Sequence, residues 1–138
     1  MSSGSQPAAI HKVGAVFLRE GGLLVVRKEG TKAFIAPGGR REPGEEALDT
    51  LRRELSEELS VELATATFFG QFSDVAAFEN IPITMDVFLV TILGEPKASA
   101  EIAEIRWVSG GLDKLPLGSI LSAHVIPELR RRGLLGIG

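Results

Sequence analysis

Three glutamates stand close together in the sequence at a spacing that has chemical meaning. Glu54, Glu57 and Glu58 occupy positions i, i+3 and i+4, so on a helix their carboxylates would share one flank. Like charges at this spacing repel one another, and a bound divalent cation would remove that cost. Hard cations such as Mg²⁺ and Mn²⁺ prefer carboxylate oxygens as ligands. The spacing therefore predicts a metal site, with an ordinary acidic solvent-exposed helix face as the alternative.

The basic residues around these glutamates favour a metal. A solvated acidic face usually carries basic partners four residues away. Glu54 has Glu58 at that distance, and Glu58 has Glu62. Only Glu57 has a basic residue at helical spacing, which is Arg53. The helix face is poorly neutralised, but the helix by itself leaves both interpretations open.

A loop rich in proline and glycine precedes the glutamates. It runs through residues 37–44 and begins Pro37-Gly38-Gly39. Glycine allows the backbone to approach a ligand closely and to adopt dihedral angles that other residues avoid. A carbonyl oxygen of this loop could therefore add a ligand to the cation. Taken alone, the loop is better explained as a turn between a strand and a helix.

The surrounding pattern predicts the elements that must hold these residues. We expect a helix over residues 45–59, because leucines recur at spacings of three and four at Leu48, Leu51, Leu55 and Leu59. Glu45 and Glu46 would lie in its first turn, where the helix dipole favours negative charge. A second helix is expected over residues 121–132, with Gly133 as its stop. Strands are expected at residues 10–19, 23–28, 61–63, 67–72, 83–93 (buried) and 102–108. Strands mixed with two main helices predict an α/β (α+β) fold, with helices packed on a sheet.

Length and composition limit the class of protein. The chain has 138 residues, of which 44% are hydrophobic, and we expect a leader over residues 1–9 and one domain over residues 10–138. Its net charge of −3 gives no general attraction for nucleic acid polymers or acidic membranes. There is no cysteine, which excludes disulfides, thiolate zinc sites and cysteine nucleophiles and is compatible with the cytoplasmic location we expect. No apolar run reaches the roughly 18 residues that a membrane span needs.

The loop and the helix together match a known motif. Gly39, Glu45 and residues 53–61 resemble the Nudix box, G-x5-E-x7-R-E-U-x-E-E-x-G-U, in which U is a bulky aliphatic residue. One defined position differs, because Ser60 stands where the family usually has glycine. We interpret that glycine as a helix-end residue, so the change concerns backbone geometry more than chemistry. The strands expected at residues 10–19 and 23–28, joined as a hairpin by the turn at Gly21-Gly22, and the strand that contains Trp107 are also similar to the family.

The resemblance implies a fold, a reaction and a set of site residues. The family fold is a mixed β-sheet sandwiched between helices, an α/β/α sandwich, and its members use Mg²⁺ or Mn²⁺ to direct water onto a phosphorus of a diphosphate. By this resemblance the expected metal ligands are Glu54, Glu57, Glu58 and the carbonyl of Gly38. Arg53 and Glu45 resemble the pair that orients the glutamates.

The general base is left open by the sequence. In some relatives a glutamate of the box does this work, and in others a glutamate of a later loop does. Glu57 and Glu101 are the two candidates here, and Glu104 is a third. Simple surface charge is the alternative for Glu101 and Glu104. The expected catalytic residues are Arg53, Glu54, Glu57 and Glu101.

The substrate expected from the resemblance is a small nucleotide. A MutT-like pyrophosphohydrolase acting on nucleoside triphosphates is the first hypothesis. ADP-ribose, a nucleotide sugar or a dinucleoside polyphosphate is the alternative. Ala77 stands where ADP-ribose enzymes tend to carry proline, and the chain has no tyrosine, which dinucleoside enzymes often carry. A non-catalytic ligand-binding domain is a third hypothesis, but the box carboxylates are complete. The oligomeric state is left open.

Other residues able to do chemistry are given smaller roles. His11 and His124 are the two histidines, and they lack metal-ligand spacing. We expect both to be surface or partly buried polar residues. Phe34 and Phe78 are the candidates for stacking on a base, although aromatic residues usually belong to the core. Arg27 and Lys28 are candidates for contact with phosphates, although solvated charge is the favoured interpretation of both.

Overall fold

The computed structural model describes residues 10–75, 81–109 and 114–135. Its strands are β1 (Ile10–Val16), β2 (Leu18–Arg19), β3 (Gly22–Lys28), β4 (Phe34–Ile35), β5 (Gly38–Arg40), β6 (Glu62–Val75), β7 (Pro82–Leu93) and β8 (Ile102–Val108). Its helices are α1 (Ala47–Leu59), the π-helical η3 (Ile120–Val125) and α2 (Ile126–Arg131). None of the helices in these ranges is long and apolar enough to cross a membrane.

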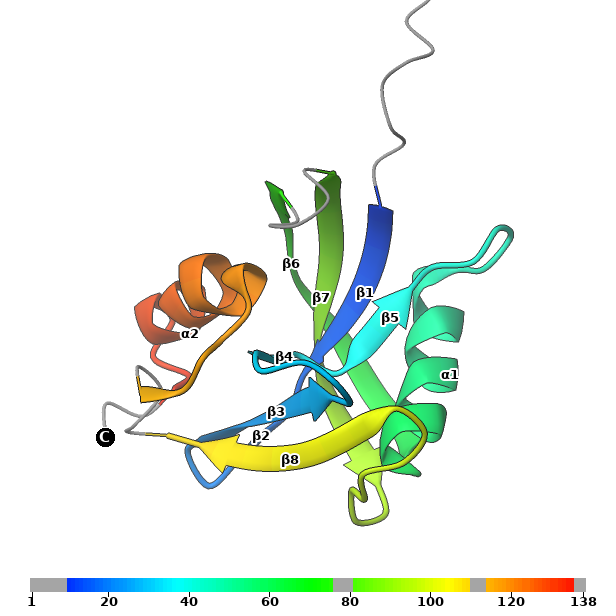
Figure 1. Ribbon diagram of the computed structural model, residues 1–138, viewed down its shortest axis with the longest axis horizontal. Helices are drawn as coiled ribbons and strands as arrows, with labels where there is room; N and C mark the ends of the chain where they lie inside the picture. Colours follow the sequence, from blue (N-terminus) through cyan, green and yellow to red (C-terminus); the bar gives the residue numbers. More distant parts are fainter. Residues whose placement is uncertain (1–9, 76–80, 110–113, 136–138) are drawn as a thin grey trace, which may run out of the picture.

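The strands form two sheets. The first has the order β5-β1-β7-β6, and it is mixed because β1 pairs parallel with β7 while its other pairs are antiparallel. In the second, β3 pairs with β2, β4 and β8. Helix α1 lies on one side of the strands, and η3 with α2 lies on the other (Figure 1). This arrangement confirms the expected mixed fold with helices on both sides of the strands.

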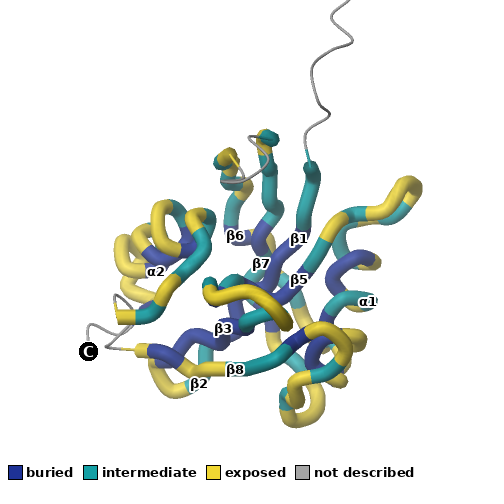
Figure 2. The backbone as a smooth tube through the Cα atoms, in the orientation of Figure 1, coloured by how far each residue is buried: buried dark blue, intermediate teal, exposed yellow. Residues whose placement is uncertain are grey.

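Alternation along β1 builds a separate core on each face of the first sheet. Successive strand residues point to opposite faces, so Val13 and Ala15 join the core under α1, while Val16 joins the core under η3 and α2. The α1 core contains Leu51, Leu55 and Leu59. The core of the other face contains Leu121, Val125 and Leu129. Figure 2 shows the buried segments in the central strands and on turns of α1 and α2.

Several element boundaries differ from the sequence expectation. The two short strands expected at residues 61–63 and 67–72 are one strand, β6, with register shifts near Leu63 and Phe68. The strand expected at residues 10–19 is divided at Phe17 into β1 and β2, which belong to different sheets. Bulges and a change of sheet leave no clear trace in hydrophobic periodicity, because they change hydrogen bonding without interrupting an apolar run.

Two further expectations were wrong in detail. Helix α1 begins at Ala47, so Glu45 precedes the helix and Glu46 is its N-cap rather than a first-turn residue. The side chain of Asp49 accepts a hydrogen bond from the Glu46 N–H at 3.2 Å.

Strand β7 was expected to be buried, yet only Val87 and Val90 in it are buried. The helices cover only part of this long strand, so its ends remain partly accessible.

Candidate active site

Helix α1 carries the three glutamates of the motif, and its apolar stripe determines which of them turns inward. Three leucines of the stripe are at most 1% exposed: Leu51, Leu55 and Leu59. Glu58 shares their edge of the helix and is 2% exposed. The side chain of Glu54 is 15% exposed, and that of Glu57 is 55% exposed. The carboxylates therefore run from the core out to solvent along one flank.

Two glycines of the preceding loop let the backbone reach these carboxylates. The Gly38 N–H donates a hydrogen bond to Oε1 of Glu58 at 3.0 Å. Gly38 has a φ of 144°, and a Cβ there would overlap the Val13 carbonyl oxygen. A Cβ on Gly39 would lie 2.6 Å from both carboxylate oxygens of Glu54. Backbone contact therefore requires glycine at position 38, whereas a side chain at position 39 would displace the Glu54 carboxylate.

Arg53 joins Glu45 to Glu54. Its Nε and Nη2 donate to the carboxylate of Glu45 at 2.9 and 3.0 Å. Its Nη1 donates to Oε2 of Glu54 at 2.8 Å and lies 3.7 Å from Oε1 of Glu57. Thr50, which is fully buried, donates its hydroxyl to Glu45 at 2.7 Å. The guanidinium thus fixes the orientation of the carboxylate of Glu54. The part of Arg53 and Glu45 in the reaction stays a prediction.

The carboxylates of this cluster differ in their affinity for protons. Hydrogen bonds from Arg53 and Thr50 lower the pKa of Glu45 to about 2. Burial raises the pKa of Glu58 to about 7, although the Gly38 N–H opposes the shift. Burial also raises the pKa of Glu54, against the opposing effect of Arg53. Negative charge on the two inward carboxylates is therefore costly, and a cation beside them would relieve that cost.

The loop before β8 carries Glu101, whose charge acts on the same carboxylates. Nζ of Lys28 lies 3.3 Å from Oε2 of Glu101. Beyond the effect of burial, the charge of Glu101 raises the pKa of Glu58, while Lys28 lowers it. Lys28 also lowers the pKa of Glu54, against the raising effect of burial. The charges of Glu101 and Lys28 therefore both act on the motif carboxylates, and a part for Glu101 in the chemistry stays a prediction.

The oxygen donors of this cluster fit a hard divalent cation. Carboxylates and a backbone carbonyl are the ligands that Mg²⁺ and Mn²⁺ prefer. Over residues 10–75, 81–109 and 114–135, no three His, Cys, Asp or Glu side chains are arranged as a ready metal site. The ammonium of Lys28 and the guanidinium of Arg53 stand among the carboxylates. Coordination by Glu54, Glu57, Glu58 and the Gly38 carbonyl therefore stays a prediction.

The remaining charged candidates have structural partners. Glu104 accepts hydrogen bonds from Arg106 at 2.9 Å and from Arg27 at 3.2 Å, and these contacts lower its pKa. His11 lies 2.8 Å from Asp86 on the neighbouring β7. The Arg27–Glu104 and His11–Asp86 pairs join neighbouring strands, whereas Arg106 and Glu104 lie on the same strand. His11 is a partly buried polar residue, as expected.

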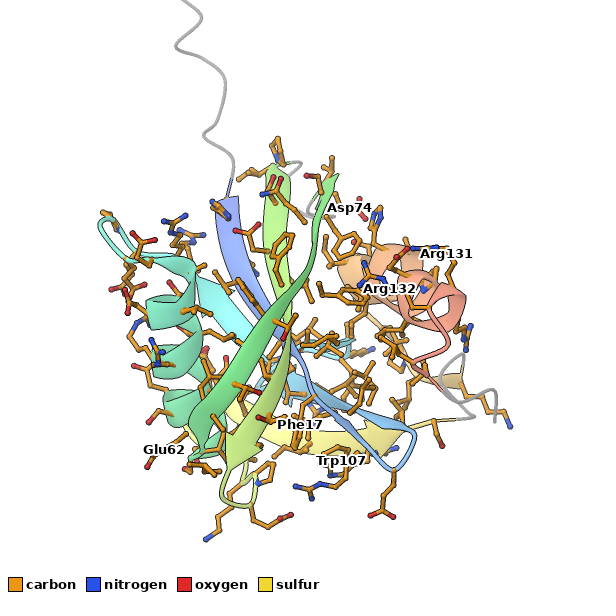
Figure 3. The ribbon with its side chains drawn as sticks, turned by 180° about the vertical axis from the view of Figure 1, so that it is seen from behind. Phe17, Glu62, Asp74, Trp107, Arg131 and Arg132 are labelled. Atoms are coloured by element: carbon orange, nitrogen blue, oxygen red, sulfur yellow. The ribbon has the colours of Figure 1, made fainter. Side chains whose placement is uncertain are left out.

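The aromatic candidates have a different outcome. Phe34 is 4% exposed and belongs to the core under η3 and α2, so it cannot stack on a base. Phe78 lies outside the described residues, as does Ala77. Trp107 is 39% exposed and packs edge-on against Phe17, as Figure 3 shows from behind.

An apolar cavity of about 160 Å³ lies on the other face of the first sheet. Its walls include Ile35, Ala36 and Met85 from the strands and Ser119, Ile120 and Leu121 from the start of η3. These residues are scattered through the sequence and carry no motif, which is why sequence reasoning missed them. The missed Thr50 and Lys28 contacts likewise depend on distances that spacing does not give.

Comparisons with known proteins agree with this architecture. The family model of the NUDIX domain matches residues 10–124. The solution structure of the E. coli ORF135 protein has a TM-score of 0.75 and 24% identity, over 96% of this chain and 97% of that one. A MutT NUDIX hydrolase from Burkholderia pseudomallei has a TM-score of 0.74 and 24% identity, over 88% and 97%. A UDP-X diphosphatase has a TM-score of 0.76 and 21% identity, over 96% and 67%. The search of curated proteins finds no match.

Proposed function

The chain belongs to the NUDIX domain family, and we propose that it hydrolyses a phosphoanhydride bond of a nucleoside triphosphate with the help of Mg²⁺ or Mn²⁺. One observation carries this proposal. Arg53 clamps Glu54, while Glu58 is buried against the Gly38 N–H. A helix that served only as a solvated acidic face would not bury one carboxylate and lock another.

Each residue of the cluster has a role in this proposal. Glu54, Glu57, Glu58 and the Gly38 carbonyl would hold the cation. When bound, the cation would neutralise phosphate charge and lower the pKa of a bound water. Arg53 and Glu45 keep Glu54 in position. Glu57 or Glu101 would take the proton from the attacking water, because both carboxylates reach the solvent-facing side of the cluster.

The apolar cavity supports a nucleotide as the substrate. Apolar walls with a few polar groups are typical of small-molecule sites. Ala36 lines the cavity, and Gly38, only two residues along the chain, contacts Glu58. Extended backbone covers about 7 Å in two residues. A base held in the cavity would therefore keep its phosphates within reach of the α1 carboxylates.

The first experiment identifies the substrate and tests the metal. Release of phosphate and pyrophosphate would be measured for nucleoside triphosphates, ADP-ribose, nucleotide sugars and dinucleoside polyphosphates, with Mg²⁺ or Mn²⁺. We expect metal-dependent turnover of triphosphates and a loss of at least ~100-fold in Glu57→Gln. Glu62→Gln is the matched control, because Glu62 is an exposed acid at the start of β6, and it should retain activity.

The other outcomes separate the remaining hypotheses. Preference for ADP-ribose, a nucleotide sugar or a dinucleoside polyphosphate would contradict the triphosphate as the substrate. The roles proposed for the site residues would be unaffected. No turnover of any compound, together with metal and nucleotide binding, would contradict catalysis and support a ligand-binding domain.

A further inference from the structure

Ser60 occupies a backbone conformation that suits glycine. It caps the C-terminal end of α1 with φ 58° and ψ 39°, in the left-handed region. A residue with a Cβ is strained there by roughly 1 kcal/mol. This position is the single departure from the Nudix box. The Ser60 side chain lies 2.9 Å from the Ser99 hydroxyl, oxygen to oxygen, so the serine supplies a contact that glycine could not.

The segment that contains Ser99 is fastened to the end of the motif helix. The Lys97 N–H donates to the Leu59 carbonyl at 2.9 Å, and the Ser99 N–H donates to the Glu58 carbonyl at 2.9 Å. Residues 97–99 thus satisfy carbonyls that the end of α1 would otherwise leave unpaired. The segment thus lies at the end of α1, just before β6 begins at Glu62, which Figure 3 labels.

The same segment determines where Glu101 lies. Ala100, between Ser99 and Glu101, is a second non-glycine residue with positive φ, at 53°. The Ile102 N–H then donates to the Ser99 carbonyl at 3.0 Å, and the Glu101 carbonyl accepts from the Glu29 N–H at 2.8 Å. A tight turn of this kind keeps its strained residue only if both sides are held. On the side that faces the helix, the Ser60–Ser99 pair adds to the two backbone hydrogen bonds from Lys97 and Ser99.

We propose that Ser60 and Ser99 are positioning residues that hold Glu101 beside the α1 carboxylates. The hydroxyl pair joins the end of the helix that carries Glu58 to the turn that carries Glu101. Lys28 completes the arrangement from β3 by its ion pair with Glu101. This inference rests on the proposed function, because it assigns Glu101 to the reaction.

The test separates positioning from simple stability. Ser99→Ala removes the contact without changing a left-handed residue, and Ser60→Gly removes it while relieving backbone strain. A neutral hydrogen bond contributes about 1 kcal/mol, which corresponds to a three- to tenfold change in rate. We expect kcat to fall by this factor in both variants with KM unchanged. Ser60→Gly should keep the Tm of the parent chain.

A double variant shows whether the effect passes through Glu101. In a Glu101→Gln background, Ser99→Ala should cause no further loss of kcat. An undiminished loss in that background, or full activity in both single variants, would overturn the proposal. The matched control is Ser73→Ala, because Ser73 makes a similar hydroxyl contact of 3.1 Å with Thr84 away from this turn, and it should leave kcat unchanged.

Amide hydrogen exchange in metal-free protein gives a reading independent of turnover. In Ser99→Ala the amides of Ile102 and Glu29 should exchange faster, because both are bonded within the turn. Unchanged exchange would contradict the positioning role, even if no substrate were turned over. Faster exchange with no turnover of any substrate would instead contradict the proposed function alone.

Discussion

On the α1 side of the first sheet, charged and polar groups fix the positions of the carboxylates. On the η3 side, apolar contacts shape the cavity. Arg53 makes charge-assisted hydrogen bonds to Glu45 and Glu54, and such bonds fix both distance and direction. The cavity beside η3 is lined mainly by aliphatic side chains such as Ile35 and Met85, whose contacts are non-directional. The first face is suited to place reacting groups, and the second to select a ligand by shape.

Glycine substitutions should give the largest contrast between the two faces. Gly39→Ala would place a Cβ 2.6 Å from the carboxylate oxygens of Glu54, so the carboxylate must move. We expect kcat to fall at least ~100-fold, because a displaced Glu54 carboxylate would no longer be placed to hold the cation. Gly118→Ala is the matched change beside the cavity, where its Cβ would lie 3.0 Å from Cγ2 of Ile35. Gly118→Ala should change KM and not kcat. Equal losses of kcat in both variants would contradict the difference between the two faces.

Two arginines test the same contrast with a milder change. Arg53→Lys keeps the charge but loses the planar fork that bonds Glu45 and Glu54. Loss of charge-assisted bonds should lower kcat by about 10- to 100-fold. On the other face, Arg132 donates to the Phe69 carbonyl at 2.9 Å and lies over the Phe69 ring. Arg132→Lys should lower the free energy of unfolding by about 1 kcal/mol, measured by urea denaturation, with kcat within twofold of the parent.

A change in the cavity wall should affect binding alone. Met85→Ala removes apolar contact from the cavity while leaving the α1 cluster untouched. If the base of the substrate lies there, KM should rise about tenfold with kcat unchanged. Steady-state kinetics with the substrate found in the first experiment measures both constants. A fall in kcat at constant KM would mean that the cavity does not hold the substrate.

The smallest effect on stability should come from protonation of one carboxylate on the η3 side, that of Asp74. Hydrogen bonds from the Val75 N–H and from Ser119 lower the pKa of Asp74, and His124 lies 3.4 Å away. Figure 3 shows Asp74 on β6 near η3 and α2. Because the folded pKa is depressed, this stabilisation is present above the ordinary pKa near 3.9 and is lost as the pH falls through the folded value. Asp74→Asn should therefore flatten the dependence of Tm on pH below about pH 4, and an unchanged dependence would exclude the contribution.

The α1 side could be predicted well because its information is local in sequence. Residues 53–61 carry their chemistry at helical spacing, and the burial of Glu58 beside the leucine stripe follows from that spacing alone. The interpretation of position 60 as a helix-end residue is confirmed by the left-handed φ of Ser60. Membership of the family and the mixed fold are confirmed by the domain match and the structural neighbours.

The η3 side could not be predicted, because its walls come from segments far apart in the chain. Ile35, Met85 and Leu121 meet only after the sheet has formed. Phe34 was weighed as a stacking residue, yet it is buried, because pairing of β4 with β3 turns it into the core. The link between Ser60 and Ser99 also escaped the sequence, since two distant serines have no periodicity.

The parallel pairing of β1 with β7 also determines the order in which the domain can assemble. The partner of Ile10 in this pair is Ile83. Pairing of the two central strands of the first sheet therefore brings together residues that are far apart in the sequence. Such non-local pairings slow folding, whereas the contacts within α1 form early. During synthesis the edge of β1 that later meets β7 stays unpaired until residues 82–93 have left the ribosome. Aggregation before that moment is the kinetic hazard of this topology, and docking of β7 ends it.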